Sequence, residues 1–217
     1  MIAHVIGSTG LTGSALLDLL LTEPRIEKVH SYSRSKTNKL SSKLEEHLGD
    51  LTDADYWDRD LAGDLLFICI GTTQAKTPDR QLYYAIDYGI PVAAARAAKK
   101  GGLSKVLVIS SLGADARSKS FYLRTKGEME KSLMDLYPAG LSIFQPSLIM
   151  GDRQESRFLE GISQKIFKLL KPVIPKKYQG VDHRDIVKAM LKLGLAPEIK
   201  AARVIPSDEI PSLAERY

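Results

Sequence analysis

The turn after the first apolar run is the feature that most constrains the fold of this chain. Gly7, Gly10 and Gly13 follow the run at residues 3–6 and open a stretch of helical periodicity at residues 12–22. In a strand–turn–helix unit, the first glycine permits the tight turn, the second lets the backbone approach a pyrophosphate, and the third lets the helix pack closely on the strand. The amino end of the helix then offers unpaired N–H groups to the phosphates. The spacing predicts a dinucleotide-binding turn, and the alternative is a glycine-rich turn without a ligand.

Apolar runs rich in β-branched residues alternate with segments of helical periodicity over residues 1–150. This alternation is typical of βαβ units, and it predicts an α/β fold with a Rossmann-type doubly wound parallel sheet. Right-handed crossovers place helices on both faces of such a sheet. The expected strands cover residues 3–6, 28–33, 47–48, 65–70, 105–110 and 141–145, and the expected helices cover residues 12–22, 91–100 and 121–136.

The sequence changes in character after Pro146, where further prolines divide the chain into shorter segments. We expect two amphipathic helices in this part, at about residues 157–170 and 185–195, and a late strand near residues 203–205. The first of these helices is expected to cover the active-site cleft, and a surface for a membrane or a partner is the alternative.

The composition fits one globular domain. Of the 217 residues, 44% are hydrophobic and 26% are charged, which excludes intrinsic disorder, collagen-like repeats and disulfide scaffolds. We expect a single NAD(P)-binding domain over residues 1–217. Its Rossmann core is expected at residues 1–150, with a small C-terminal part at residues 151–217 on the substrate side of the cleft.

Charge, hydropathy and cysteine content limit the partners and the location. The net charge of +5 lacks the density of a nucleic-acid-binding stripe. We find no apolar stretch that could span a membrane, and the first residues lack the basic start of a signal peptide. The single Cys69 cannot form an intrachain disulfide, which fits a reducing compartment. We therefore expect a cytoplasmic protein with neither nucleic acid nor membrane among its partners.

The end of the second expected strand bears on the choice of cofactor. Sites that prefer NAD place an acidic residue there, about 20 residues after the glycine turn, to hold the ribose 2′-hydroxyl. This chain has Ser33 followed by Arg34. A guanidinium suits a 2′-phosphate by its charge and its forked geometry. The sequence therefore predicts NADP(H), and the alternative for Arg34 is a solvated surface residue.

Two Tyr-x-x-x-Lys pairs occur, and their context distinguishes them. Tyr32 and Lys36 fall in an expected strand, where four-residue spacing does not bring side chains together. Tyr122 and Lys126 open an expected helix, where positions i and i+4 share a face. A lysine ammonium beside a phenol stabilises the phenolate, so such a tyrosine can exchange a proton with a substrate oxygen. Ser111, which follows the preceding strand, is the candidate for holding a carbonyl group.

The four histidines are His4, His30, His47 and His183. Three of them fall in or beside expected strands, and no spacing suggests a paired metal site. We therefore expect all four to be structural and expect no metal site.

Four stretches resemble the atypical short-chain dehydrogenases/reductases. They are Cys69–Thr73, Ser110–Asp115, Tyr122–Glu128 and Asp152–Arg157, and the last is the most distinctive. Within that superfamily, the chain resembles the Tat-interactive-protein oxidoreductase-like family and its bacterial relatives from about residue 2 to residue 190. The resemblance implies an NADPH-binding Rossmann domain that reduces a small-molecule carbonyl or oxidises an alcohol, as a monomer or a homodimer.

The resemblance also implies roles for individual residues. The cofactor contacts would come from Thr9, Gly10, Leu11 and Thr12 at the pyrophosphate, Arg34 and Ser35 at the 2′-phosphate, Asp50 and Leu51 at the adenine, Ile70 and Gly71 beneath the cofactor, and Ile149 and Arg157 on the nicotinamide side. Tyr122 would be the proton donor or acceptor, and Lys126 its partner and a contact of the ribose. Ser111 would be the substrate-orienting serine, with Ser110 as the alternative.

One position departs from the superfamily pattern. Many members carry an asparagine in the helix after the fourth strand, and this chain has Asp87 there. The departure keeps a second hypothesis open, in which the protein is an NADPH-sensing regulatory or protein-binding module with little turnover. A nucleotide-sugar epimerase is a third hypothesis, although the C-terminal part after Met150 is small for the substrate domain of such enzymes.

Overall fold

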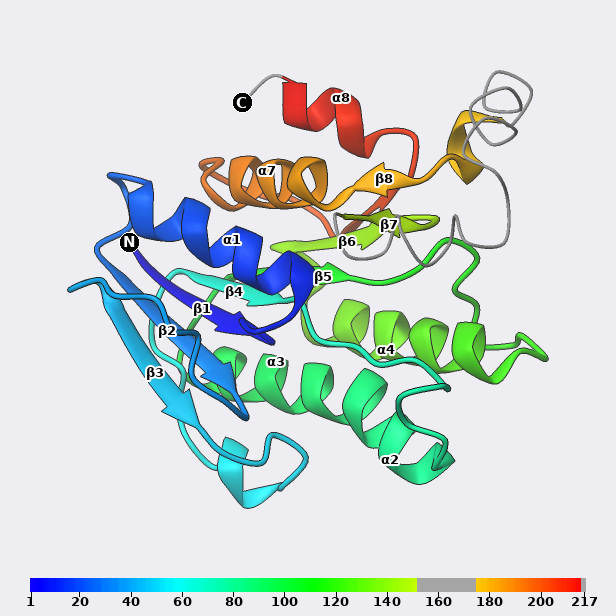
Figure 1. Cartoon of the computed structure of the whole chain (residues 1–217), viewed down its shortest axis with the longest axis horizontal. Helices are drawn as coiled ribbons and strands as arrows, with labels where there is room; N and C mark the ends of the chain where they lie inside the picture. Colours follow the sequence, from blue (N-terminus) through cyan, green and yellow to red (C-terminus); the bar gives the residue numbers. More distant parts are fainter. Residues whose placement is uncertain (152–174, 216–217) are drawn as a thin grey trace.

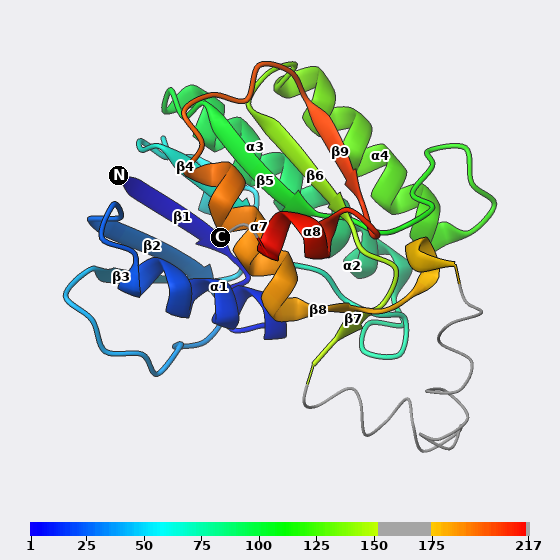
Figure 2. The same cartoon turned by 90° about the horizontal axis from the view of Figure 1, so that it is seen from above.

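The computed structural model describes residues 1–151 and 175–215. Within these residues, seven parallel strands form one sheet in the order β3-β2-β1-β4-β5-β6-β9 (Figures 1 and 2). The strands are β1 (Ile2–Ile6), β2 (Lys28–Ser33), β3 (Leu44–Leu48), β4 (Leu65–Ile68), β5 (Lys105–Ile109), β6 (Leu141–Gln145) and β9 (Arg203–Pro206). Helices lie on both faces of the sheet, which confirms the predicted Rossmann-type doubly wound fold.

Two pairs of helices cover the sheet (Figure 1). Helices α1 (Leu11–Thr22) and α7 (His183–Gly194) lie on one face, and α3 (Ile90–Lys100) and α4 (Phe121–Leu136) lie on the other. Helix α8 (Ile210–Glu215) packs against α7. The shorter elements are η1 (Asp55–Trp57), α2 (Arg80–Tyr84), the π-helix η2 (Ala85–Gly89), η3 (Lys176–Tyr178), and the strands β7 (Ile149–Met150) and β8 (Val181–Asp182), which pair with each other.

Strand β4 lies in the middle of the sheet and separates two hydrophobic cores. Leu65 and Phe67 belong to the core beneath α1 and α7, and Leu66 and Ile68 belong to the core beneath α3 and α4. All four side chains are fully buried, because helices cover both faces of a parallel sheet. The continuous apolar run at this position therefore reports burial on both faces.

The order of the strands reverses at β1, which pairs with β2 on one side and with β4 on the other. In open α/β sheets, ligands bind in the crevice that this reversal opens at the carboxyl ends of the strands. The glycine turn follows β1 directly, so the topology places it at this crevice.

The C-terminal residues belong to the same sheet and cores as the N-terminal residues. Strand β9 pairs with β6 at the edge of the sheet, and α7 packs against α1. The predicted late strand and the predicted helix at residues 185–195 are confirmed by β9 and α7. The helix expected at residues 157–170 lies outside the described residues. Across residues 1–151 and 175–215, no helix is long and apolar enough to cross a membrane.

Two strand boundaries differ from the prediction by more than one residue. The third strand, expected at residues 47–48, begins at Leu44 because residues 44–48 pair with residues 29–33 of β2 at the edge of the sheet. The fourth strand, expected to reach residue 70, ends at Ile68. Cys69 still donates its N–H to the Ile6 carbonyl oxygen at 2.9 Å, but the next residues leave the sheet. Ile70 therefore lies beyond the strand, where its apolar side chain lines the crevice at the carboxyl ends of the strands.

Candidate cofactor and active site

The glycine turn has the geometry that its spacing predicts. Gly7 has a φ of +83°, a left-handed conformation that favours glycine. A Cβ on Gly7 would also lie 3.0 Å from the Cys69 carbonyl oxygen at the end of β4. A Cβ on Gly13 would lie 2.1 Å from the Gly7 carbonyl oxygen. These two glycines therefore allow β1, α1 and β4 to pack closely.

Gly10 differs from its neighbours because it faces open space. Among the described residues, a Cβ on Gly10 would meet only the Gly7 carbonyl oxygen, at 3.4 Å. Gly10 is the N-cap of α1, no side chain caps the helix, and its first turn carries no acidic residue. The unpaired N–H groups and the positive end of the helix dipole therefore suit a pyrophosphate, and the space above Gly10 leaves room for it.

Alanine substitutions separate these two roles. We expect Gly13→Ala to destabilise the protein by about 1–3 kcal/mol, because its methyl group has to displace backbone atoms. We expect Gly10→Ala to cost less than about 1 kcal/mol and to weaken dinucleotide binding at least about tenfold, because its methyl group occupies the pyrophosphate space. Urea denaturation and fluorescence titrations with NADH and NADPH measure the two effects. A Gly10→Ala protein with unchanged dinucleotide affinity would contradict this division.

A cleft of about 740 Å³ lies at the carboxyl ends of β1, β2, β3 and β4. This volume is within the range of small-molecule and cofactor sites. Many of the predicted cofactor contacts line the cleft, namely Gly7, Thr9, Gly10, Arg34, Asp50, Leu51, Ile70 and Gly71.

The structure places other predicted contacts outside the lining of this cleft, namely Leu11, Thr12, Gly13, Ser35, Tyr122, Lys126 and Ile149. Thr12 and Gly13 are buried in the first turn of α1, because that turn packs on β1. Ser35 is exposed beyond the end of β2. Ile149 lies in β7 and packs against the core beneath α1 and α7. Arg157 and the stretch at residues 152–157 lie outside the described residues.

The end of the cleft beside β2 and β3 carries a cation. No carboxylate follows β2 directly, and Arg34 lines the cleft there together with Asp50. The hydroxyl and the N–H of Thr52 donate to Asp50 Oδ1 at 2.7 and 2.9 Å. These hydrogen bonds, together with the charge of Arg34, hold the pKa of Asp50 below its usual value. The Asp50 carboxylate is thus bonded to its own loop, which leaves Arg34 to contact an anion.

The loop after β4 contributes a further wall of the cleft, which no pattern in the sequence predicts. Thr72, Lys76 and Thr77 of this loop line the cleft. The Thr72 and Thr77 hydroxyls lie 2.8 Å apart, and Tyr83 donates its hydroxyl to the Thr72 carbonyl oxygen at 3.4 Å. The stretch at residues 69–73 marks the start of this loop. Lys76 and Thr77 follow no periodic pattern, and their positions depend on how the loop folds back.

A buried ion pair lies directly behind the cleft wall. Lys126 Nζ lies 2.8 Å from Asp87 Oδ1, and the two side chains are 6% and 1% exposed. The Thr72 N–H donates to the other carboxylate oxygen of Asp87 at 2.8 Å. A Cβ on Gly71 would lie 3.6 Å from Lys126 Nζ and 3.3 Å from Asp87 Oδ1. The cleft and the Tyr-x-x-x-Lys motif therefore meet at Gly71.

Asp87 reaches Lys126 from an irregular segment. It belongs to the π-helix η2, which joins α2 to α3. Single π turns inside helices occur frequently at functional sites. The position that departs from the superfamily's asparagine therefore supplies the counter-charge of the motif's lysine.

Tyr122 and Ser111 lie on two elements that are packed closely together. Tyr122 is in the first turn of α4, one turn before Lys126, and is 40% exposed. Ser111 is buried just beyond the carboxyl end of β5 and donates its hydroxyl to the Leu112 carbonyl oxygen at 3.4 Å. The loop after Ser111 contacts α4, because a Cβ on Gly127 would lie 2.2 Å from the amide nitrogen of Ala116. The glycine of the Tyr122–Glu128 stretch thus permits this close contact.

A second buried acid, Glu130, lies one turn beyond Lys126 on α4. Gln145 Nε2 donates to its two carboxylate oxygens at 2.9 and 3.1 Å. Burial raises the pKa of Glu130, whereas Ser110, Gln145 and Lys126 oppose this shift. The Lys126 ammonium therefore lies in the field of two carboxyl groups, Asp87 and Glu130.

Comparisons with known proteins agree with this fold. Residues 3–130 match the family described as NAD dependent epimerase/dehydratase. "Protein FMP52, mitochondrial" from Debaryomyces hansenii is 34% identical over 176 residues, which are 77% of this chain and 74% of that protein. The protein of the same name from Candida albicans is 28% identical over 99% of this chain and 98% of its own length.

Solved structures give the same result. A short-chain dehydrogenase/reductase superfamily protein from Agrobacterium tumefaciens, with bound NAD, superposes with a TM-score of 0.69 at 16% identity. The match covers 100% of this chain and 81% of that protein. The likeness at this identity concerns the fold.

The expected cytoplasmic location is wrong. It is contradicted by the relatives from Debaryomyces hansenii and Candida albicans, whose names describe them as mitochondrial. The prediction depended on the absence of an intrachain disulfide. A chain with one cysteine, Cys69, lacks such a disulfide in every compartment, so this feature carries no information about location.

Proposed function

We propose that this chain, which belongs to the NAD dependent epimerase/dehydratase family, is an NADP(H)-dependent oxidoreductase of the atypical short-chain dehydrogenase/reductase type. Its substrate is a small-molecule carbonyl or alcohol compound. The observation that carries the proposal is the meeting of the cleft with the Lys126–Asp87 pair at Gly71. A dinucleotide in the cleft would have its reactive end next to the Tyr-x-x-x-Lys motif.

The proposed cofactor contacts begin at the glycine turn. The open end of α1 binds the pyrophosphate through backbone N–H groups, at the place where Gly10 leaves space. Asp50 and Leu51 face the adenine, and Arg34 binds the 2′-phosphate. The preference for NADP(H) over NAD(H) is supported by the cation at this end of the cleft and by the lack of an acidic residue directly after β2.

We expect the protein to bind NADPH more tightly than NADH, and Arg34→Ala to weaken NADPH binding about 10- to 100-fold. A hydrogen bond to a charged phosphate contributes about 1.5–3 kcal/mol to binding. NADH has no 2′-phosphate and therefore makes no such bond with Arg34. Titrations that follow nicotinamide fluorescence measure both dissociation constants. Arg117→Ala removes an exposed arginine that does not line the cleft and is the matched control. If Arg34→Ala kept the preference for NADPH, the assignment of Arg34 would be wrong.

In the proposed reaction, bound NADPH supplies the hydride. Tyr122 donates a proton to the carbonyl oxygen of the substrate and accepts it in the reverse direction. Lys126 supplies a positive charge that stabilises the phenolate and contacts the ribose, and Asp87 holds the ammonium in position. Ser111 orients the carbonyl group. Ile149 and Arg157 are proposed to close the nicotinamide side.

Turnover with a panel of aldehydes and ketones tests the reaction, with NADPH consumption as the readout. We expect at least one compound in the panel to be reduced only when the protein is present, at a rate that saturates with its concentration. A protein that binds NADPH tightly but reduces nothing in the panel favours the second candidate, an NADPH-sensing module. The Asp87 carboxylate favours that candidate, because it offsets the charge with which Lys126 stabilises a phenolate.

We also propose, from the resemblance of the sequence, that the chain is a member of the Tat-interactive-protein oxidoreductase-like family within the superfamily. The same resemblance supports a monomeric or homodimeric state. A nucleotide-sugar epimerase is the third candidate, and the description of the matched family is the observation that favours it. Adding UDP-sugars to the substrate panel distinguishes it, since an epimerase converts them without net consumption of NADPH.

A further inference from the structure

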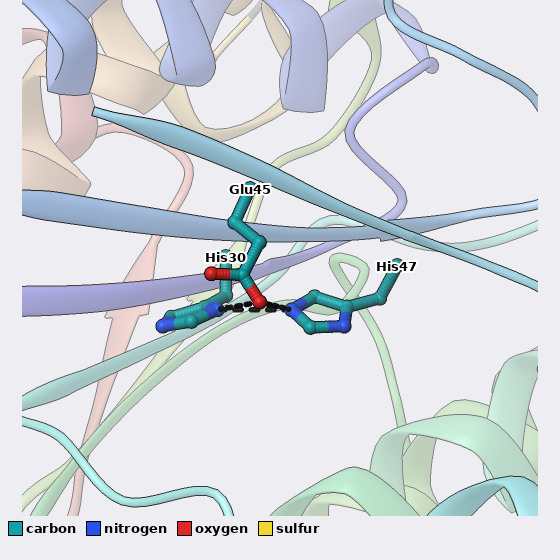
Figure 3. Close-up of side chains that lie close together, drawn as sticks. All are labelled: His30, Glu45 and His47. Atoms are coloured by element: carbon teal, nitrogen blue, oxygen red, sulfur yellow. Dashed lines mark hydrogen bonds and ion pairs between the residues drawn. The ribbon is translucent and has the colours of Figure 1, made fainter. Parts of the chain in front are cut away.

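Three side chains on neighbouring strands converge at the edge of the sheet. His30 lies on β2, and Glu45 and His47 lie on β3. The strand register pairs His30 with Glu45 and Tyr32 with His47. Side chains of a strand alternate between its two faces, so these four share one face. Figure 3 shows the two imidazole rings turned toward each other, with the Glu45 carboxylate beside the gap between them.

We propose that His30, Glu45 and His47 form a binding site for a divalent transition-metal ion of the zinc type. His30 Nδ1 lies 2.9 Å from His47 Nε2, and Glu45 Oε1 lies 3.3 Å from His47 Nε2 and 3.8 Å from His30 Nδ1. In a tetrahedral zinc site, bonds of about 2.0–2.2 Å space the ligand atoms about 3.3 Å apart. Rearrangements of a few tenths of an ångström therefore bring all three atoms to bonding distance of one ion.

The chemistry of the three groups fits such an ion. Two imidazoles and a carboxylate are ligands that zinc takes in proteins, and a water molecule completes a site of this kind. Burial lowers the pKa of His30 and of His47, which favours the neutral imidazole that a metal requires. Glu45 is 44% exposed, and this gives an ion a path from solvent.

Neighbouring rings hold the two imidazoles in place. His30 stacks on His4 with ring centroids 4.9 Å apart, and His47 stacks on Tyr32 with centroids 4.8 Å apart. The nitrogens of His4 are occupied by the Tyr32 hydroxyl at 3.1 Å and the Ala62 carbonyl oxygen at 3.2 Å. His4 is therefore a support for the site rather than a ligand, and groups that orient metal ligands in this way raise metal affinity.

Two nearby cations, Lys28 and Arg59, oppose the ion, because both repel positive charge at His47. Lys28 Nζ lies 2.5 Å from Glu45 Oε2. This contact engages Oε2 of the carboxylate and leaves Oε1 for the metal. Removal of the Lys28 charge is therefore expected to strengthen metal binding.

The site joins the edge strand of the sheet to its neighbour. Among residues 1–151 and 175–215, strand β3 pairs on one side only, with β2, and an ion held by both strands fixes their register. Arg34 follows β2 and Asp50 follows β3 within a few residues. An ion at this site thus stabilises the strands that carry the adenosine end of the cleft, although metal binding itself does not depend on the proposed cofactor.

Calorimetric titration of the tag-free, full-length protein with zinc chloride tests the proposal. We expect one ion per chain, with affinity at least about tenfold weaker in Glu45→Gln and in His47→Gln. Cobalt(II) is expected to give the visible absorption of a four-coordinate site in the wild type and to lose it in both variants. Glu46→Gln is the matched control, because Glu46 lies on the same strand and its contact to the Thr37 N–H needs only an acceptor oxygen.

Two further results decide the outcome. Lys28→Met is expected to bind zinc several-fold more tightly than the wild type, and all variants without metal are expected to keep the wild-type circular dichroism spectrum. No saturable binding by the wild type would overturn the proposal. Equal zinc affinity in the wild type, Glu45→Gln and His47→Gln would also overturn it, since the ion would then lie elsewhere on the molecule.

Discussion

Tyr122→Phe is expected to lower kcat for carbonyl reduction at least about 100-fold. General acid–base catalysis by a positioned side chain contributes about 10²–10⁴-fold to a rate, and phenylalanine lacks the proton. Tyr122 is 40% exposed, and its hydroxyl has no hydrogen-bond partner among the described residues. The loss of the hydroxyl therefore leaves the fold intact. We expect the dissociation constant of NADPH and the urea midpoint to stay close to those of the wild type.

Steady-state rates with a substrate from the carbonyl panel, together with an NADPH titration, measure this separation. Tyr178→Phe is the matched control, because Tyr178 is an exposed tyrosine of η3 that does not line the cleft. A Tyr122→Phe protein with the wild-type kcat would remove Tyr122 from the proposed mechanism. A large loss of NADPH affinity would instead mean that the hydroxyl contributes to cofactor binding.

Local patterns in the sequence predict the parts of the fold that short segments determine by themselves. The apolar run at residues 65–70 is typical of a strand buried on both faces, and β4 forms such a strand over its first four residues. The spacing of Gly7, Gly10 and Gly13 predicts the turn, because each glycine acts on atoms a few residues away or on one neighbouring strand. Arg34 is found in the same way, by its distance from the turn along one βαβ unit.

Contacts between segments that are far apart in the sequence cannot be predicted from such local patterns. The pairing of Asp87 with Lys126 depends on a π-helix that no periodicity indicates. The convergence of His30, Glu45 and His47 depends on the register of β2 and β3. Inspection of histidine spacing along the chain therefore could not find this cluster, since a shift of one residue would turn the side chains of one strand to the other face.

The second large effect is expected at the buried ion pair between Lys126 and Asp87. We expect Asp87→Ala to lower the free energy of unfolding by about 3–5 kcal/mol, because it leaves the Lys126 ammonium buried without a counter-charge. It also removes the acceptor of the Thr72 N–H. The double variant Asp87→Ala/Lys126→Met is expected to recover much of this loss, because a buried pair replaced by apolar groups leaves no uncompensated charge.

Urea denaturation of the wild type, the two single variants and the double variant gives the coupling energy between the residues. Asp60→Ala is the control, since Asp60 pairs with Lys100 on the surface and the midpoint is expected to stay unchanged. Additive losses in the double variant would contradict a coupled pair.

Asp87→Asn separates the charge of Asp87 from its hydrogen bond. The amide oxygen of asparagine can still accept the Thr72 N–H, but it no longer neutralises Lys126. If the carboxylate mainly compensates the buried charge, Asp87→Asn loses nearly as much stability as Asp87→Ala. If the carboxylate mainly restrains turnover, as a sensing module requires, Asp87→Asn gains reductase activity with NADPH affinity unchanged. Stability and turnover measured on this one variant therefore distinguish the two roles of the carboxylate. They can do so because the charge that stabilises the fold is also the charge that faces Lys126 behind the cleft.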